Sequence, residues 1–479
     1  MSGRPPVPAA LVDALVAHQR RVGAGPAAER AARALLDGAT VVATGQQPGL
    51  LGGPLLSLHK AVGALAQARR RSRPGAPVVA VFWVASDDHD WDEMDTATVL
   101  DAVGAPRVLS LGVDGAGRSV ADVPLDPAAT GRVLDALAAA LPATERGREA
   151  LALARPSSET TDLATWSTEV LARVLGDVGL VFVEPRVLAP WSGPALAALV
   201  RHADAIGDAV RAEVGRRRAA GLAVPVDPRP DEAPLFVRSA PRGPRLRVGF
   251  DGARVRLRGE PSAFDRATLA AALERDPSLG SADVVGRVLL QDALLPVVAQ
   301  VAGPTEAAYV AAVAPAHAVL GLGAPEVVAR PSGAWADERA LAALAEAGLD
   351  ARAVARGAPV PAAALEVATP DDDEAAALRR TADEVEAVLA RLSREPGVAH
   401  ALGGAVRGLR DAAEAHRRAL GADAERAVAR RRRAVEALRP RGRAQERVLS
   451  PVSIVARRGV EGVRQGLEAV AAADDFVVV

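Results

Sequence analysis

The chain has 479 residues, which exceeds one ordinary domain and predicts two or three. Although 49% of the residues are hydrophobic, no apolar run reaches the ~18 residues of a membrane span, and the N-terminal segment lacks a signal-peptide pattern. We therefore expect a soluble, cytoplasmic protein. With a formal net charge of −1, the chain as a whole has no positive electrostatic field that would favour binding to nucleic acid or acidic membranes. The absence of cysteine excludes disulfides, thiolate metal sites and a cysteine nucleophile.

Two residue types occur once each in the sequence. Lys60 is the single lysine among 58 basic residues, and Tyr309 is the single tyrosine. Asparagine is absent, whereas alanine, arginine, glycine and proline are abundant, which is typical of a GC-rich gene. A high GC content in the gene favours arginine over lysine, and disfavours tyrosine, wherever another residue serves. A lysine or tyrosine that survives therefore indicates a position where arginine or phenylalanine would not serve. Chance survival is the alternative for either residue.

The first part of the chain contains a predicted strand–helix–strand unit. Within the first ~35 residues, Leu11 and Leu15 have helical spacing. A short β-branched strand then covers residues 40–44, the loop GQQPGLLGG follows, and a helix is expected from Pro54 to about Arg71. The next segment, PVVAVFWVA, is almost entirely apolar, as in a strand buried on both faces of a parallel sheet. Parallel strands joined by a helix imply a right-handed crossover.

Further strands are predicted at Leu180–Val183, around residues 297–301 and near Val327. The segments at about 100–160 and 205–285 are loop-rich, and the second contains an antiparallel-looking piece. We interpret both segments as insertions into one doubly wound α/β core that spans residues 1–370.

Residues 371–440 have the pattern of a coiled-coil hairpin. The first of its helices carries a heptad seam, at Leu378, Ala382, Val385, Leu389 and Leu392. The sequence EPG then breaks the helix, and a second helix, from about Val398 to Leu438, continues the spacing. A hairpin that mediates dimerisation and a solvated hairpin with no partner both fit this pattern. The tail, residues 441–479, is too specific for a plain linker and is expected to pack back on the core.

The loop after the first strand combines glycines with two glutamines. Ligands of open α/β sheets lie beyond the carboxyl ends of the strands, where this loop is expected. Gly49 and Gly53 would let backbone approach a ligand closely, and the following helix N-terminus favours an anion. Gln46 and Gln47 add amide groups suited to hydroxyls or carboxylates. The loop matches neither a dinucleotide-binding nor a Walker pattern, and a tight structural turn is the alternative.

Lys60 lies about two turns into the predicted helix, off its leucine face, with its side chain leaning back toward the loop. A compact ammonium there would lie near a bound anion, where the planar fork of arginine fits differently. A plain surface lysine is the alternative.

The densest titratable cluster follows the second strand. Residues 87–93 carry five carboxylates, including Asp88, Asp90 and Glu93, together with His89. Crowded carboxylates beside an imidazole suit general acid–base catalysis. The same groups could ligate a divalent metal, and a solvated acidic loop is a third interpretation.

A third constellation follows the strand around residue 300. Gly303, Thr305 and Glu306 open a helix, Tyr309 lies one turn further on, and Gln291 precedes the strand. Thr305 could simply cap the helix, whereas the single tyrosine favours a ligand-facing role.

Four segments together resemble the bacillithiol biosynthesis cysteine-adding enzyme family, the cysteine ligase family called BshC. They are TGQQPGLLGGPLLSLHKA, PVVAVFWVASDDHDWDEM, LLPVVAQVAGPTEAAY and AQERVLSP, in this order over nearly the whole chain. The resemblance implies a Rossmann-like core with connecting-peptide insertions and an α-helical coiled coil that mediates homodimers. The family's core-site positions match here at Gln46, Gln47, Gly49, Gly53, Lys60, Asp88, His89, Asp90 and Glu93. Asp87 stands where the family often has glutamate. The two insertions match the family too weakly for any of its substrate-contacting residues to be assigned within them.

The resemblance also implies a ligase that forms an amide bond between L-cysteine and glucosaminyl-malate. Because a carboxylate must be activated first, ATP or another nucleotide is expected as energy source, with no metal implied. On this interpretation, Lys60 would hold a phosphate or carboxylate and His89 or Asp88 would accept the amine proton, with Asp90 beside them. The candidate substrate-binding residues are Gln46, Gln47, Gly49, Gly53, Glu93, Gln291, Gly303, Thr305, Glu306 and Tyr309.

Two other functions stay open at this point. One is a metal-dependent hydrolase of a sugar or amide that uses the cluster at residues 87–93. The other is a non-catalytic scaffold that recruits partners through its coiled coil.

Overall fold

The computed structural model describes residues 6–238, 240–258, 264–367, 373–391 and 396–479. These residues form two compact units. The first comprises the described residues up to Trp335 together with Gln445–Val479, and the second is Ala336–Ala444. The tail thus belongs to the same unit as the α/β core. The described residues 336–367, which the sequence placed in the core, group with the helical hairpin instead.

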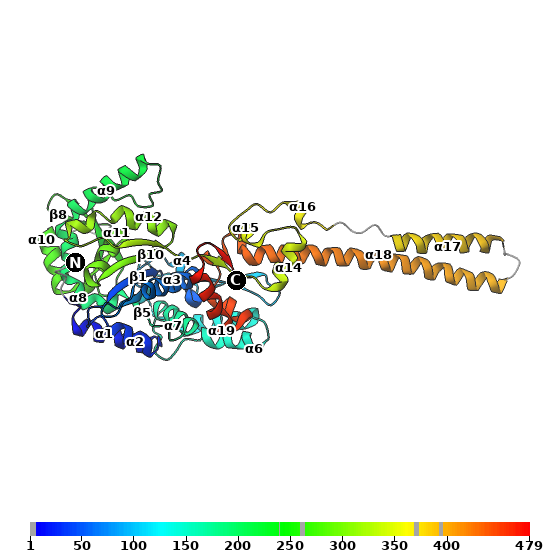
Figure 1. The fold of residues 1–479 in the computed structure, drawn as a ribbon, viewed down its shortest axis with the longest axis horizontal. Coiled ribbons are helices and arrows are strands. Elements are labelled where there is room, and N and C mark those ends of the chain that lie inside the picture. The colour runs from blue at the N-terminus through cyan, green and yellow to red at the C-terminus, as the bar shows by residue number, and fades with distance from the viewer. Residues whose placement is uncertain (1–5, 239, 259–263, 368–372, 392–395) are drawn as a thin grey trace. The chain divides into compact units, whose positions relative to one another are not determined.

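A five-stranded parallel sheet forms the centre of the first unit (Figure 1). Its strands, in spatial order, are β11 (Glu326–Ala329), β10 (Val297–Ala302), β1 (Thr40–Gln46), β2 (Val78–Val84) and β5 (Leu180–Val183). Every neighbouring pair is parallel, and Gln46 is in register with Val84. All five strands confirm the sequence prediction. The loops after β1 and β2 therefore leave the same edge side by side.

Helices cover both faces of the parallel sheet. On one face, α1 (Ala9–Arg21) and α2 (Pro26–Arg33) share a buried core with inward residues of the strands, such as Val41, Val81 and Trp83. Alternate strand residues point to the opposite face, where α3 (Leu56–Arg71) packs against β1 and β2. Burial on both faces explains why the sequence of β2 is an uninterrupted apolar run. The first unit is therefore a Rossmann-like α/β core.

The first insertion is more regular than the sequence suggested. It begins with a short helix, α4 (Trp91–Met94), and an antiparallel hairpin of β3 (Thr96–Leu100) and β4 (Pro106–Ser110). Helices α5 (Pro127–Ala140), α6 (Glu145–Ala154) and α7 (Leu163–Leu175) follow. The side chains of Asp126, Thr144 and Asp162 accept hydrogen bonds from backbone N–H groups at the three helix starts. These N-caps stabilise helices in a segment predicted to be rich in loops.

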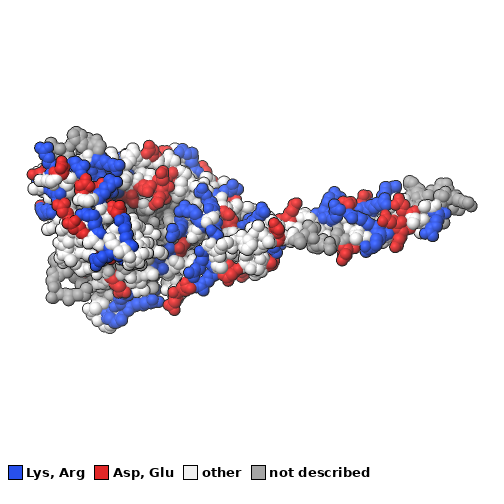
Figure 2. Space-filling view, turned by 90° about the horizontal axis from the view of Figure 1, so that it is seen from above, with Lys and Arg blue, Asp and Glu red and all other residues white. Residues whose placement is uncertain are grey.

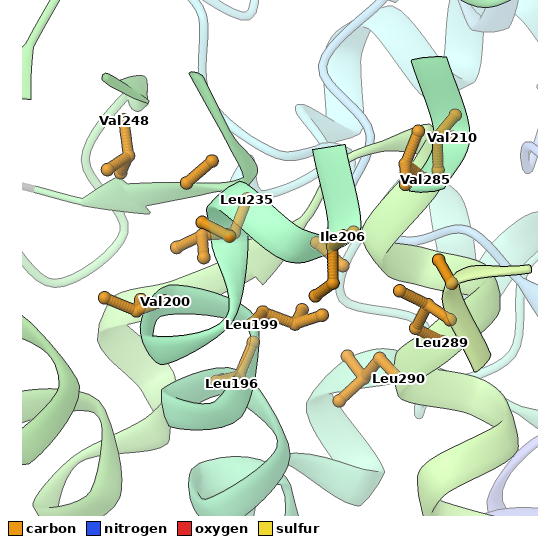
Figure 3. Packing of buried hydrophobic residues seen from close by; sticks show 14 of the residues in the cluster. Leu196, Leu199, Val200, Ile206, Val210, Leu235, Val248, Val285, Leu289 and Leu290 are labelled. Carbon is orange, nitrogen blue, oxygen red and sulfur yellow. The ribbon is translucent and has the colours of Figure 1, made fainter. Parts of the chain in front are cut away.

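The second insertion contains the predicted antiparallel strands. They form a four-stranded sheet in the order β8 (Arg254–Leu257), β7 (Arg245–Asp251), β6 (Glu232–Arg238) and β9 (Gly280–Ala282). Helices α8 (Pro185–Arg201), α9 (Ala203–Ala219), α10 (Arg266–Arg275) and α11 (Val284–Leu294) surround it. Figure 3 shows their shared core, in which Leu199, Ile206, Leu235 and Leu289 lie close together. Val310, Val313 and Ala316, from the segment that follows β10, belong to the same core, so the insertion shares its hydrophobic core with that segment.

The remaining elements of the first unit join its ends to the core. Helices α12 (Pro304–Val313) and α13 (Ala316–Val319) follow β10. The tail forms α19 (Pro451–Ala472), which is kinked at Gly459, and β13 (Val477–Val478), which pairs with β12 (Gly333–Ala334).

The second unit contains the predicted helical hairpin. Three short helices, α14 (Glu338–Glu346), α15 (Ala351–Ala355) and α16 (Ala362–Leu365), precede α17 (Asp373–Arg391) and α18 (Pro396–Leu438). Ion pairs join Arg379 to Glu414 and Arg410 to Glu386, so the two long helices run antiparallel. Between them, Ala375, Ala382, Val406 and Ala413 are buried. Leu392 and the start of the EPG break lie outside the described residues, as does the side chain of Leu389.

Within the part of the chain that the structure describes, no helix is both long and apolar enough to cross a membrane. Figure 2 shows basic and acidic side chains interspersed on the face in view, as the formal charge of −1 leads one to expect.

Candidate functional site

The two most specific sequence motifs meet at the carboxyl edge of the parallel sheet. Gln47 follows β1, Asp88 follows β2, and the side-chain amide Nε2 of Gln47 donates a hydrogen bond to Asp88 Oδ2 at 2.8 Å. Both side chains are partly exposed. This edge is where ligands bind in open α/β sheets, so the contact marks the candidate site.

The glycine-rich loop is largely buried, and three backbone amides in or just after it donate hydrogen bonds within the protein. Leu50, Leu51, Gly52 and Gly53 are all buried. The N–H of Gly49 donates to Ser167 Oγ at 3.0 Å, that of Gly53 to Leu50 O, and that of Leu55 to Leu449 O. The expectation that a helix N-terminus here holds an anion is therefore not supported. The helix also begins at Leu56, two residues later than predicted.

Glycine is required in this loop because backbone packs on backbone. A Cβ on Gly49 would lie 2.8 Å from the Cα of Gly53, which real Cβ atoms do not approach. Gly53 itself has a φ of 69° and follows two other residues with positive φ, Leu51 and Gly52. The loop therefore closes on itself in a conformation that other sequences would not readily adopt.

Lys60 is buried, with 7% of its side chain exposed, and not the surface cation that the sequence allowed. Its Nζ donates to Gly45 O at 2.6 Å and to Gln46 Oε1 at 2.9 Å, and lies 2.5 Å from Glu306 Oε2. Burial lowers the pKa of Lys60, although Glu306 acts in the opposite direction. Burial alone would raise the pKa of Glu306, but Lys60 and Arg287 hold it below its usual value. Lys60 therefore joins β1 to α12 through a buried ion pair.

A buried polar network extends from this ion pair. Gln300 Nε2 donates to Glu306 Oε1 at 3.3 Å, and Gln291 Nε2 donates to Gln300 Oε1 at 3.1 Å. On the other side of Glu306, Arg287 lies 3.6 Å away and donates to the hydroxyl of Tyr309 at 2.6 Å. The structure thus brings Gln291, Glu306 and Tyr309 together with Lys60, inside the protein.

His89 and Asp88 form the partly exposed half of the site. Asp88 Oδ1 accepts the backbone N–H groups of His89 at 2.6 Å and Asp90 at 3.2 Å. The ring of His89 meets Phe236 edge-on, and its Nδ1 lies 2.9 Å from Arg245 Nη1. Burial and the charge of Arg245 lower the pKa of His89, so the ring is neutral near neutral pH. The antiparallel insertion therefore contributes directly to the site.

Several predicted residues lie apart from these contacts. Asp90, Glu93 and Thr305 are exposed. Gly303 is the N-cap of α12, and Thr305 makes no capping hydrogen bond there. The idea that Thr305 caps this helix is wrong, because the backbone turns into the helix two residues earlier.

The tail holds both the glycine loop and the end of β11 in place. Ser450 Oγ donates to Leu51 O at 2.8 Å. Glu446 accepts two hydrogen bonds from Arg330, at 2.9 and 2.5 Å, and lies 3.1 Å from His59 Nδ1. Burial opposes ionisation of Glu446, but the bonds from His59 and Arg330 lower its pKa to about 2. The AQERVLSP motif is therefore part of the site's framework.

A cavity of about 340 Å³ lies beside the site, between the ends of β2 and β5 and the second insertion. Ser86, Asp87, Arg186 and Arg238 contribute polar groups to its lining, and Trp83, Leu196 and Leu290 are among its apolar lining residues. The hydroxyl of Ser86 is buried without a hydrogen-bond partner. Burial raises the pKa of Asp87. Such a cavity suits a small ligand that carries both charge and apolar surface.

Sequence reasoning missed the arginines that complete this site. Arg245, Arg287 and Arg330 are each at most 14% exposed in their side chains, and each contacts a residue of a recognised motif. Arginine is so abundant in this chain that no single one stood out. The available signal for Arg330 was its place directly after a predicted strand.

Among the described residues, no group of three or more histidine, aspartate and glutamate side chains has an arrangement that could hold a metal ion. In the cluster at residues 87–93, Asp88 and His89 instead face Gln47 and Arg245.

The fold defines a Rossmann-like α/β protein, and the carboxyl edge of its parallel sheet holds the candidate site. A sequence model described as "Bacillithiol biosynthesis BshC, N-terminal Rossmann-like domain" matches residues 3–331. The chain therefore belongs to the BshC family of bacillithiol biosynthesis.

Three curated relatives, each named "Putative cysteine ligase BshC", show how far the similarity extends. The protein of Symbiobacterium thermophilum is 35% identical over 341 residues, that of Heliobacterium modesticaldum 33% over 322, and that of Geobacillus thermodenitrificans 30% over 353. The matched regions cover 67%, 64% and 72% of this chain and 61%, 57% and 65% of the relatives. The similarity thus spans about three fifths of the relatives' length.

Proposed function

We propose that this protein is a ligase of bacillithiol biosynthesis that joins L-cysteine to glucosaminyl-malate through an amide bond. Family membership supports a reaction of this class. The observation that carries the proposal is the Gln47–Asp88 hydrogen bond, because it unites the two most specific family motifs in one partly exposed site. A cavity adjoins this site.

The lining of the cavity supports substrates of this kind. Cysteine and glucosaminyl-malate both carry carboxylates, and Arg186, Arg238 and Arg242 line the cavity. Arg186 is already paired with Asp162 at 2.7 Å, whereas Arg242 is exposed at the rim. The apolar lining, including Trp83 and Leu290, suits a thiol side chain. We assign cysteine to this cavity, next to the motif residues.

ATP or another nucleotide is the proposed source of energy, since amide formation from a carboxylate needs an activated acyl group. Within the glycine loop, the amides of Gly49 and Gly53 are engaged within the protein, so these two do not contribute to a phosphate site. The group most available for a phosphate is the exposed Arg242, because Arg238 at the same cavity is already paired with Asp122 at 3.2 Å. The guanidinium of Arg242 would also stabilise charge that develops on the acyl group.

The amine of the sugar must lose a proton as it attacks the activated cysteinyl carbonyl. Asp88 is the proposed acceptor, because its carboxylate is partly exposed and fixed by Gln47 and two backbone N–H groups. Lys60 and Glu306 act on the reaction only through the framework that they build. Glu93 and Asp90 stay candidates for contacts with glucosaminyl-malate at the exposed rim.

The test is a reconstitution with purified full-length protein. Glucosaminyl-malate, labelled cysteine and one nucleotide at a time are incubated with it, and the thiol product is identified by mass. We expect product with one nucleotide only, and loss of product in Asp88→Asn. Asp135→Asn, an exposed carboxylate on α5, controls for the loss of one charge. Absence of product with every nucleotide and with pre-activated cysteine would reject the proposal.

A further inference from the structure

The contact between His89 and Arg245 fixes which ring nitrogen of the histidine carries a proton. Arg245 Nη1 lies 2.9 Å from His89 Nδ1. A guanidinium has only N–H donors and stays protonated, so the histidine nitrogen that faces it must be the acceptor. In the neutral ring, the proton then lies on Nε2.

Arg245 is itself held rigidly from three sides. Its Nε donates to Ser281 Oγ at 2.9 Å, its Nη2 donates to Ala282 O at 2.9 Å, and its guanidinium stacks 4.2 Å from the centre of the Phe236 ring. Only 4% of its side chain is exposed. Because these contacts lie within the second insertion, the arginine cannot turn away from His89 without leaving buried partners.

The other charged groups around His89 do not compete for Nδ1. Asp88 Oδ1 is 3.8 Å from Nδ1, beyond hydrogen-bond distance, and already accepts two backbone N–H groups. Asp90 and Arg247 act on the ring only through their charges, in opposite directions. A second proton on the ring would place an N–H group against the guanidinium of Arg245.

We propose that His89 acts as a neutral hydrogen-bond donor through Nε2, and that Arg245 is the positioning residue that keeps it in this state. With 37% of its side chain exposed, the ring is accessible to a ligand. It would donate to an oxygen of the substrate, such as the carbonyl or phosphate oxygen of the activated acyl group, and it would not serve as the base. This role rests on the proposed function, whereas the protonation state of the ring does not.

The protonation state is tested by nitrogen NMR of the full-length protein with labelled histidine. The His89 signals are assigned by their loss in His89→Gln. We expect one protonated nitrogen at neutral pH, assigned as Nε2, and a second proton only at a lower pH than an ordinary histidine requires, because burial and Arg245 lower the pKa of His89. In Arg245→Met, the Nδ1 contact is gone, so the ring should gain a second proton at higher pH and populate the other tautomer. Arg247→Met, on the same strand and over the same Phe236 ring, should leave the proton on Nε2, because the contact between Arg245 and Nδ1 remains and only the charge effect of Arg247 is lost.

Activity measurements then separate a donor from a base. An amide side chain can donate a hydrogen bond but cannot accept a proton at neutral pH, so His89→Gln should keep about ten-fold more activity than His89→Ala. Arg245→Lys should retain part of the activity lost in Arg245→Met, mainly in kcat. A proton found on Nδ1, or equal loss of activity in both His89 variants, overturns the inference. Failure of the ligase assay alone would leave the NMR result standing and reject only the proposed function.

Discussion

The ammonium of Lys60 is engaged within the protein. Gly45 O and Gln46 Oε1 accept hydrogen bonds from Nζ, and Glu306 Oε2 forms an ion pair with it at 2.5 Å. The compact group fits a closed pocket where the larger fork of arginine would not, which gives a physical reason for the survival of one lysine. The structure places this single lysine against Gln46 and Glu306, inside the framework of the candidate site.

We predict that Lys60→Met lowers the free energy of unfolding by about 3–5 kcal/mol, because the buried carboxylate of Glu306 then keeps only the more distant cation Arg287, 3.6 Å away. Urea unfolding measures the effect. The double variant Lys60→Met with Glu306→Gln should recover part of the loss, since the carboxylate that lost its ion pair is then replaced by a neutral amide. A loss in Lys60→Met below about 1 kcal/mol would show that the ion pair does not stabilise the fold.

Glu446 should make the protein sensitive to acid. Its folded pKa of about 2 lies below the ordinary value of 4.5, so the stabilisation is complete above pH 4.5 and is lost as the pH falls toward 2. The shift corresponds to roughly 3 kcal/mol. In Glu446→Gln, the unfolding free energy should be lower at neutral pH and should fall less steeply between pH 4.5 and 2. An unchanged slope in chemical unfolding at several pH values would contradict this prediction.

At the scale of single residues, the sequence could predict candidate site residues of rare types or in distinctive clusters. It could not predict those of common types. Gln47, Asp88 and His89 stand in distinctive motifs and do meet in the structure. Arg245 lies 156 residues from His89 in sequence, in the second insertion. Only the folded arrangement of the insertion shows which arginine reaches the site.

The glycine loop after β1 is the element whose geometry depends most on residue size. We predict that Gly49→Ala destabilises the protein by about 1–3 kcal/mol, because the new Cβ would collide with the backbone of Gly53. Gly215→Ala is the matched control, since Gly215 lies in the middle of α9 with open space around it. There, alanine should stabilise by roughly 0.5–1 kcal/mol through its helix propensity. Thermal unfolding of both variants checks the contrast, and equal effects would refute it.

Helices and strands with a clear hydrophobic periodicity or an apolar run could be predicted from the sequence. Helices that depend on N-capping residues could not. The five core strands are short runs of β-branched and apolar residues, which one sequence suffices to recognise. The helices of the first insertion depend on single capping residues such as Asp126 and Thr144, which resemble ordinary loop residues in sequence. The pairing order of the strands follows from packing in three dimensions.

Dimerisation through the helical hairpin of the second unit stays a proposal that the family resemblance suggests. The heptad seam is already used inside the hairpin, where Ala382 and Ala413 are buried between α17 and α18. A second copy would therefore have to pack on the outward face. Val388, 43% exposed on α17, is a large apolar residue on such a face. Contact through it would be small, so we expect a concentration-dependent dimer.

Sedimentation of the full-length protein over a range of concentrations tests this proposal. We expect a monomer–dimer equilibrium that Val388→Asp shifts at least ten-fold toward monomer, because a carboxylate would be desolvated in the contact. Val103→Asp places the same charge at a more exposed valine of the other unit and should leave the equilibrium unchanged. A monomer at all concentrations would argue for a solvated hairpin, and an unaffected dimer in Val388→Asp would place the contact on another surface.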